Sequence, residues 1–307
     1  MPALTVQKSI SINAPVEKVY LIVRDFKQWP VWSPWLSSEP DCSLEYADDG
    51  KSYQWDGKII GSGSLKVTEE EKNQNIGYRL EMLTPWKSAS DVQMTFVPQE
   101  QGVEVTWSMQ GSLPIFLFFM QKMMTSIIGS DYERGLRMLK DYIELGAVPS
   151  KMEMLGEQEV SALRYIGIKR SVLIDQVEKA MEADLKALVD LHKEKKIAHC
   201  GPPLSIYHKW DLKNSATEYT IAFPVLDLPD SLPDIFTIGE IPAHRAYQIK
   251  HIGPYRHLGN AWSAGMARKQ AKYFRMAKAP DMFEIYLNSP QEVQESELES
   301  LLHFPLK

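Results

Sequence analysis

Residues 103–110 read VEVTWSMQ, with apolar and polar side chains in strict alternation. Because side chains on a strand point to opposite faces in turn, this period of two predicts a half-buried antiparallel strand. Residues 76–82, IGYRLEM, show a similar alternation, and Asn73, Asn75 and residues 99–102 supply turn residues between the strands. The first half of the chain therefore predicts a meander of antiparallel strands.

The period becomes helical after Pro114, where Met123, Ile127, Leu136 and Leu139 recur on one stripe. A helix of this length can lie across one whole face of the sheet. A curved sheet closed by a helix leaves a cavity lined by inward side chains, and such pockets are mostly apolar. We therefore expect an α+β chain that begins with a helix-grip cup for an apolar ligand.

Three segments of this half resemble a known family. They are INAPVEKV at 12–19, the tryptophan-rich stretch 29–35, and a closing helix with GL at 135–136. Over residues 1–146 the chain resembles the START-related polyketide cyclase/dehydrase and lipid-transport superfamily (SRPBCC). The resemblance implies a cup for hydrophobic ligands and leaves lipid carriage and cyclase activity both open. We expect the tryptophans of 29–35 in a loop near the mouth of the cup.

The second half, residues 152–307, follows a boundary expected at GAVPS, 146–150, and contains an internal echo. SALRYI at 161–166 leads into a helical pattern, and AHRAYQI at 243–249 leads into a second helix expected over 255–276. Two strand patterns follow each helix. These features predict a duplicated βαββ domain whose ligand site lies between the copies.

The strand pattern MFEIYL at 282–287 carries the most informative polar residue. Alternation places Phe283, Ile285 and Leu287 in the core. Met282, Glu284 and Tyr286 share the other face. A carboxylate between a thioether and a phenol suits a cationic ligand, through charge pairing and cation–π attraction. The alternative is a solvated glutamate on an edge strand.

This region resembles a second family. The segments GPY at 253–255, FEIYL at 283–287 and FPL at 304–306 resemble the GyrI-like domain, the effector-binding domain of AraC-type and multidrug-responsive activators. The resemblance implies that Glu284 is the buried glutamate of the ligand cleft. It further implies ligand contacts from five aromatic residues: Tyr255, Trp262, Tyr286, and, from the first repeat, Tyr165 and Tyr207. Activators place a helix-turn-helix ahead of this domain, whereas here a cup precedes it, so we expect no direct DNA binding.

Composition argues against several classes of protein: nucleic-acid-binding, secreted and membrane-spanning. The formal charge is -6, which gives no basic footprint for nucleic acid. With only Cys42 and Cys200 and no secretory signal at its start, the chain is expected to be cytoplasmic. Its most apolar run, Leu113 to Phe119, is far shorter than the roughly 18 residues of a membrane span.

No metal or other cofactor is expected, because His244, His251 and His257 have no carboxylate or cysteine partner at ligand spacing. Arg268, Lys272 and Arg275 are expected on one helix face, either solvated or as the surface for an unidentified protein partner.

Three functions fit these residues. The first is binding of small hydrophobic or cationic aromatic molecules, for sensing, sequestration or detoxification. The second is hydrolysis of an electrophilic small molecule, with Glu284 as general base. The third is a cyclase or lipid carrier acting through the first cup. The sequence leaves open whether the protein is an enzyme, which ligand it takes, its oligomeric state and any coupling of the domains.

Overall fold

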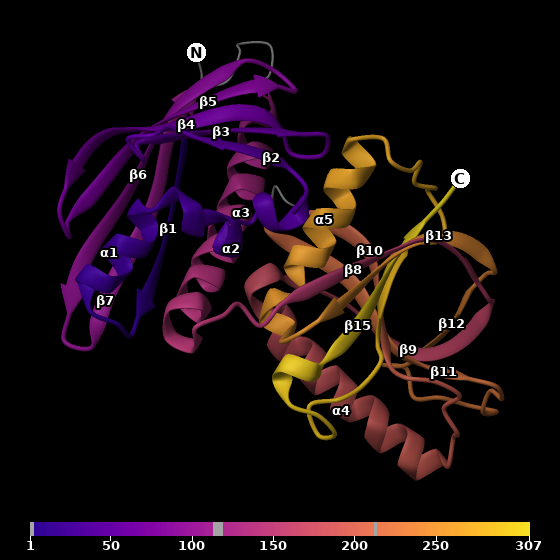
Figure 1. Cartoon of the computed structure of the whole chain (residues 1–307). Helices are drawn as coiled ribbons and strands as arrows, with labels where there is room; N and C mark the ends of the chain where they lie inside the picture. Colours follow the sequence, from indigo (N-terminus) through magenta and orange to yellow (C-terminus); the bar gives the residue numbers. More distant parts are fainter. Residues whose placement is uncertain (1–2, 113–118, 212–213) are drawn as a thin grey trace. The chain divides into compact units, whose positions relative to one another are not determined.

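The computed structural model describes residues 3–112, 119–211 and 214–307. Contacts between Cα atoms divide the chain into two units, Met1–Pro149 and Ser150–Lys307. Each unit is built on one antiparallel sheet with helices, so the chain is α+β as predicted (Figure 1). Most of the apolar run from Leu113 lies outside the described residues. No helix within the described ranges is long and apolar enough to cross a membrane.

The described strands of the first unit form one seven-stranded sheet in the order β1-β7-β6-β5-β4-β3-β2. The two alternating segments that predicted the meander fall in β5 and β7, so that prediction is confirmed. The strands are β1 (Ala3–Ile12), β2 (Ser43–Tyr46), β3 (Ser52–Gly57), β4 (Gly61–Glu71), β5 (Asn75–Thr84), β6 (Ser88–Gln99) and β7 (Gly102–Ser112).

The long helix α3 (Gln121–Leu145) packs on this sheet, next to β1 (Figure 1). Its buried stripe includes Leu136 and Leu139 from the predicted pattern. The helix ends at Gly146, whose φ of 83° is the left-handed conformation that glycine adopts readily at a helix C-terminus. Between β1 and β2 lie two short helices, α1 (Val16–Arg24) and α2 (Trp29–Trp32).

The tryptophans of 29–35 do not form the loop that we expected. Trp29 and Trp32 belong to α2 and are 2% and 0% exposed. Their rings pack against Trp107 of β7, with centroids 5.8 and 5.6 Å away. The expectation of a loop at the mouth is wrong because these indoles are large enough to fill the interior between sheet and helix.

The second unit has eight described strands in the order β12-β9-β11-β10-β14-β15-β13-β8. The order is symmetrical about the β10–β14 pair: β9-α4-β10-β11 and β13-α5-β14-β15 are the two predicted βαββ copies, and β8 and β12 are additional edge strands. The elements are β8 (Lys151–Val160), β9 (Leu163–Leu173), α4 (Val177–Lys195), β10 (Leu204–Asp211), β11 (Ala216–Val225), β12 (Thr237–Ile241), β13 (His244–Ile252), α5 (Gly259–Gln270), β14 (Met282–Tyr286) and β15 (Glu299–Pro305).

Both helices of the second unit cover the same face of its sheet. Leu188 of α4 packs with Ile221, and Ala261 of α5 packs with Leu302. Ile221 and Leu302 share a face, because the cross-strand pairs link both of them, through Ser205 and Glu284, to one row. We call this surface the helix face and the other one the open face.

The helix α5 is shorter than expected. It ends at Gln270 rather than near residue 276, and Lys272 has a left-handed φ of 63°. Arg268 is 7% exposed, and its guanidinium donates a hydrogen bond to the carbonyl of Ala264. The predicted helical face of Arg268, Lys272 and Arg275 is therefore wrong, because the helix ends before the last two and buries the first.

Candidate functional site

Glu284 lies near the centre of the helix face. Its direct partners across the sheet are Ser205 on β10 and Leu302 on β15. Only 1% of Glu284 is exposed. The alternative of a solvated glutamate on an edge strand is therefore wrong, because β14 is an inner strand and both repeats contribute to covering it.

Three side chains donate hydrogen bonds to this carboxylate. The hydroxyls of Tyr207 and Tyr286 donate to Oε1 over 2.8 and 2.7 Å. The indole Nε1 of Trp262 donates to Oε2 over 2.6 Å. Tyr207 comes from the first repeat and Trp262 and Tyr286 from the second. The structure thus brings three of the predicted aromatic residues together around Glu284, at the junction of the two copies.

Burial dominates the electrostatics of Glu284. Loss of water raises the pKa of the carboxyl group, while the hydrogen bonds from Tyr286, Tyr207 and Trp262 act in the opposite direction. Glu284 forms no ion pair with any described residue. An ionised carboxylate here is held by dipoles alone, which is an expensive arrangement in a low-dielectric interior unless a positive charge joins it.

Tyr255 extends the aromatic cluster towards solvent. It follows β13 in a short 3₁₀ turn, Tyr255–His257, and is 39% exposed. Its ring lies 5.4 Å from that of Tyr286, edge to face. Burial and the charge of Glu284 raise the pKa of Tyr255 to about 12, so its hydroxyl keeps its proton at neutral pH. The ring of Tyr207 stacks on that of Trp210, with centroids 5.0 Å apart, and Trp210 is 41% exposed.

Tyr165 does not join this cluster. Its neighbour Ile166 packs with the helix-face core, whereas Tyr165 packs with Phe283 on the open face. Sequence reasoning also missed Ser205, whose hydroxyl lies 2.9 Å from that of Tyr286. No local pattern marks this serine; only the register of β10 against β14 places it opposite Glu284.

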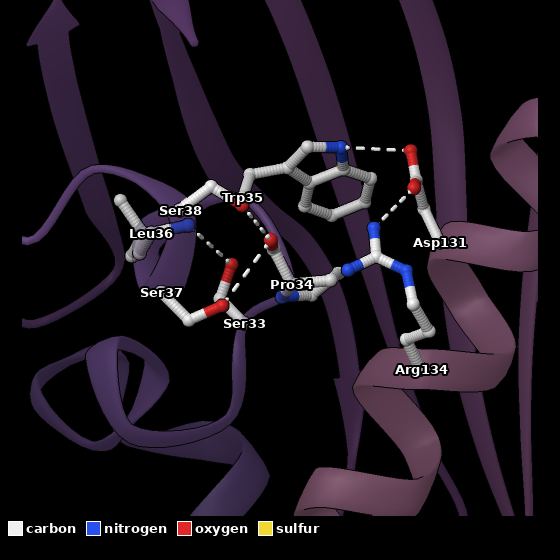
Figure 2. Close-up of polar contacts among 8 residues, drawn as sticks. All are labelled: Ser33, Pro34, Trp35, Leu36, Ser37, Ser38, Asp131 and Arg134. Carbon is white, nitrogen blue, oxygen red and sulfur yellow. Dashed lines mark hydrogen bonds and ion pairs between the residues drawn. The ribbon is translucent and has the colours of Figure 1, made fainter. Parts of the chain in front are cut away.

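The first unit has a polar contact at the edge of its aromatic interior. The indole Nε1 of Trp35 donates to Asp131 of α3 over 3.1 Å, and Arg134 pairs with the other carboxylate oxygen over 2.5 Å (Figure 2). Burial raises the pKa of Asp131, although Arg134 and Trp35 act against it. These bonds fix the segment after α2 against α3, and Figure 2 shows Ser38 donating to the carbonyl of Pro34 in the same segment.

The interior of the first unit is aromatic. Trp107 of β7 stacks on Tyr132 of α3, with ring centroids 4.2 Å apart and planes at 13°. Trp35 lies edge-on to both rings. Trp107 and Tyr132 are each 2% exposed, so these rings fill the space between sheet and helix by packing on one another. Across the described residues, no group of three or more His, Cys, Asp or Glu side chains is arranged to hold a metal ion.

Solved structures resemble parts of the chain at low sequence identity. A protein from Mesorhizobium loti is 16% identical over 46% of this chain and 97% of its own, with a TM-score of 0.37. A protein from Deinococcus radiodurans is 21% identical over 46% and 98%, with a TM-score of 0.33. EcmrR, in a complex with DNA, is 14% identical over 63% and 72%, with a TM-score of 0.45. No curated protein matched the chain.

Family models match both units. Residues 3–144 match the family described as polyketide cyclase / dehydrase and lipid transport. Residues 157–307 match the GyrI-like small molecule binding domain. The two matches agree with the two resemblances noted in the sequence and with the two sheets of the structure. The chain therefore joins a member of the polyketide cyclase/dehydrase and lipid-transport family to a GyrI-like small-molecule-binding domain.

Proposed function

We propose that the GyrI-like unit binds an organic cation with aromatic groups, and that Glu284 is its counter-ion. The observation that carries this proposal is the buried carboxylate, which accepts three hydrogen bonds but has no positive partner among the described residues. A ligand cation would complete the ion pair in a medium where the attraction is strong.

The neighbouring rings favour the same class of ligand. The rings around Glu284 contact one another in pairs: Tyr207 with Trp262, and Tyr255 with Tyr286. Aromatic faces attract cations through the ring quadrupole, by about 0.5–2 kcal/mol for each contact. A flat cationic ligand would therefore gain from both the carboxylate and the rings, whereas a neutral hydrocarbon would gain from the rings alone.

The role that follows is sensing, sequestration or detoxification of such molecules without direct contact to DNA. The match to a small-molecule-binding domain and the net charge of -6 support it. For the first unit we infer binding of an apolar molecule, which the match to the polyketide cyclase / dehydrase and lipid transport family supports.

A titration with matched ligands tests the proposal. Acridine orange, a cation at neutral pH, and anthracene, a neutral molecule of related shape, would be added to wild type, Glu284→Gln and Asp184→Asn. Asp184 is a matched control because it is also a buried carboxylate of this unit, but it is already paired with Arg170.

We expect Glu284→Gln to weaken acridine orange binding by about tenfold to a hundredfold, which is the effect of losing a charged hydrogen-bonding partner. Anthracene binding and the Asp184→Asn variant should change little. Equal affinity of wild type and Glu284→Gln for the cation would refute the proposal.

Hydrolysis is the second candidate, because burial raises the pKa of Glu284 towards the range of a general base. In that case an electrophilic substrate would be consumed with time, and Glu284→Gln would abolish its consumption while leaving the fold intact. Mass spectrometry of the ligand after incubation separates the two candidates, since a binding protein returns it unchanged. The same measurement on the first unit's ligands separates lipid carriage from cyclisation.

A further inference from the structure

A pocket lies on the open face of the GyrI-like sheet, opposite the face that carries Glu284. Its volume is about 440 Å³, within the range of ligand sites. Tyr165 of β9 and Ile206 of β10 line it, and both pack with Phe283, which points away from the helix face. Neighbouring residues of β10 therefore serve opposite faces: Tyr207 bonds to Glu284, and His208 lines this pocket.

A β-bulge interrupts β10 beside the pocket, at His208. The pairing of β10 with β11 shifts between Tyr207 and Lys209, so His208 is the additional residue. Bulges of this kind redirect a side chain and are common beside functional sites. The Nδ1 of His208 lies 2.6 Å from Oδ2 of Asp281, and its Nε2 lies 2.7 Å from the hydroxyl of Thr220.

These bonds fix the carboxylate of Asp281 at the pocket. Both ring nitrogens of His208 are engaged, so the imidazole acts as a positioning residue. Oδ1 of Asp281 has no partner among the described residues, and the side chain is 41% exposed. The pocket therefore offers a carboxylate oxygen in a defined orientation.

His244 supplies a second acceptor. Its Nδ1 lies 2.7 Å from the carbonyl oxygen of Pro242, and because a carbonyl only accepts, Nδ1 carries the proton. In the neutral ring Nε2 is then an acceptor, and this atom is buried with no partner in the described part of the chain. A buried polar atom without a partner is costly, which points to a donor supplied from outside the fold.

Tyr165 forms an aromatic wall. A Cβ atom on Gly239, its partner on β12, would lie 2.2 Å from both Cζ and the hydroxyl of Tyr165, so the ring rests directly on the glycine. Packing of an edge glycine explains the ring's position by itself. It does not account for the acceptors of Asp281 and His244 in the same pocket.

We propose that this pocket is a second ligand site that takes a small organic amine. The ammonium group donates to Asp281 and His244, and the carbon skeleton lies on Tyr165 and Ile206. No lysine or arginine is among the described residues that line the pocket. Glu240 contributes to the lining, but its cross-strand partner is Arg164, next to Tyr165, so its side chain points to the helix face and is not a ligand.

Calorimetry with butylamine and 1-butanol tests this site in the full chain. The two probes share an aliphatic chain and differ in the charged donor group, and neither carries the aromatic group of the ligands proposed for Glu284. The variants are Asp281→Asn, which keeps an acceptor for His208 and removes only the charge, Glu284→Gln, and Asp234→Asn as an exposed acidic control outside the pocket.

We expect wild type to prefer the amine, and Asp281→Asn to weaken the amine by about tenfold or more while leaving the alcohol unchanged. Glu284→Gln and Asp234→Asn should keep the amine affinity, which separates this site from the one proposed at Glu284. Amine binding that disappears in Glu284→Gln but persists in Asp281→Asn would overturn the proposal, as would equal binding of amine and alcohol.

A measurement on the unmodified protein guards against a variant that fails to fold. In NMR spectra, the ring carbon signals of Tyr165, assigned with Tyr165→Phe, should shift when butylamine is added to wild type. Those of Tyr286 on the helix face should not. Shifts confined to Tyr286 would place the amine at Glu284 and refute the second site.

Discussion

Replacing Tyr207 by phenylalanine removes one donor from the Glu284 cluster and nothing else. The hydroxyl donates to Oε1 of Glu284 over 2.8 Å. The ring would stay, because its packing on Trp210 at 5.0 Å and Trp262 at 5.2 Å does not involve the oxygen. The variant therefore isolates a single hydrogen bond to a buried carboxyl group.

The size of the effect follows from that geometry. A hydrogen bond to an ionised group contributes about 1.5–3 kcal/mol, and one to a neutral group about 0.5–1.5 kcal/mol. Oε1 keeps its bond from Tyr286, so no acceptor is left without a partner. We therefore expect Tyr207→Phe to lower the local stability around β10 and β14 by about 1–3 kcal/mol.

Hydrogen exchange measured by mass spectrometry assigns this loss to particular strands. The matched control is Tyr219→Phe. Tyr219 lies directly across the sheet from Tyr207, but its hydroxyl donates to Asp184 of α4 and not to Glu284. Protection should fall in β10 and β14 peptides for Tyr207→Phe, and in α4 peptides for Tyr219→Phe. A change below about 0.5 kcal/mol at β14, the level of an ordinary surface substitution, would refute the reasoning.

Two further predictions concern the stability of the second unit. Burial lowers the pKa of His251 and His303 to about 4, whereas an unfolded histidine titrates near 6.5. The free energy of unfolding is then independent of these two histidines above about pH 6.5. It falls as the pH drops towards 4, by about 1.4 kcal/mol per histidine per pH unit. Urea unfolding at several pH values should show a shallower dependence for His303→Phe than for wild type; identical slopes would contradict the assignment. In Gly265→Ala, the new Cβ would lie 2.1 Å from Cζ of Phe304, so the thermal midpoint should fall with a loss of about 1–3 kcal/mol, and an unchanged midpoint would show that the ring yields freely.

Periodicity predicted the main elements because burial of one face determines it. The alternation of residues 103–110 and the stripe of α3 follow directly from packing between sheet and helix. The edge strands β8 and β12 were missed because an edge strand buries fewer apolar side chains, so its sequence shows a weaker alternation. β12 is five residues long and contains Gly239, a poor strand residue in isolation.

The arrangement of the candidate site was predictable where strand alternation or the family resemblance applied. Alternation along the strand placed Tyr286 on the same face as Glu284. The GyrI-like resemblance added Trp262 and Tyr207, and the structure brings all three within hydrogen-bond distance of Glu284. Alternation also separates Tyr165 from these residues, because the adjacent Ile166 lies on the helix face. The sequence could not show this, because it does not say which face of β9 the helices cover.

The open-face pocket was beyond prediction for a related reason. His208 reaches Asp281 because β10 pairs antiparallel with β14, with Tyr207 opposite Met282, and no local pattern encodes that register. Asp281 lies 73 residues further along the chain. Contacts of this kind exist only after the two repeats have paired.

Proton release on binding tests most directly whether Glu284 is the counter-ion of a cationic ligand. Burial raises the pKa of this carboxyl group, so above the ordinary glutamate value of about 4.3 part of the unliganded protein still holds the proton, and a cation would expel it. Titration calorimetry with acridine orange in buffers of different ionisation enthalpy counts the protons released. We predict proton release by wild type, approaching one proton per cation at the lower pH values, and none from this group in Glu284→Gln. Equal release from both proteins, or tight binding without any release across that range, would contradict this prediction.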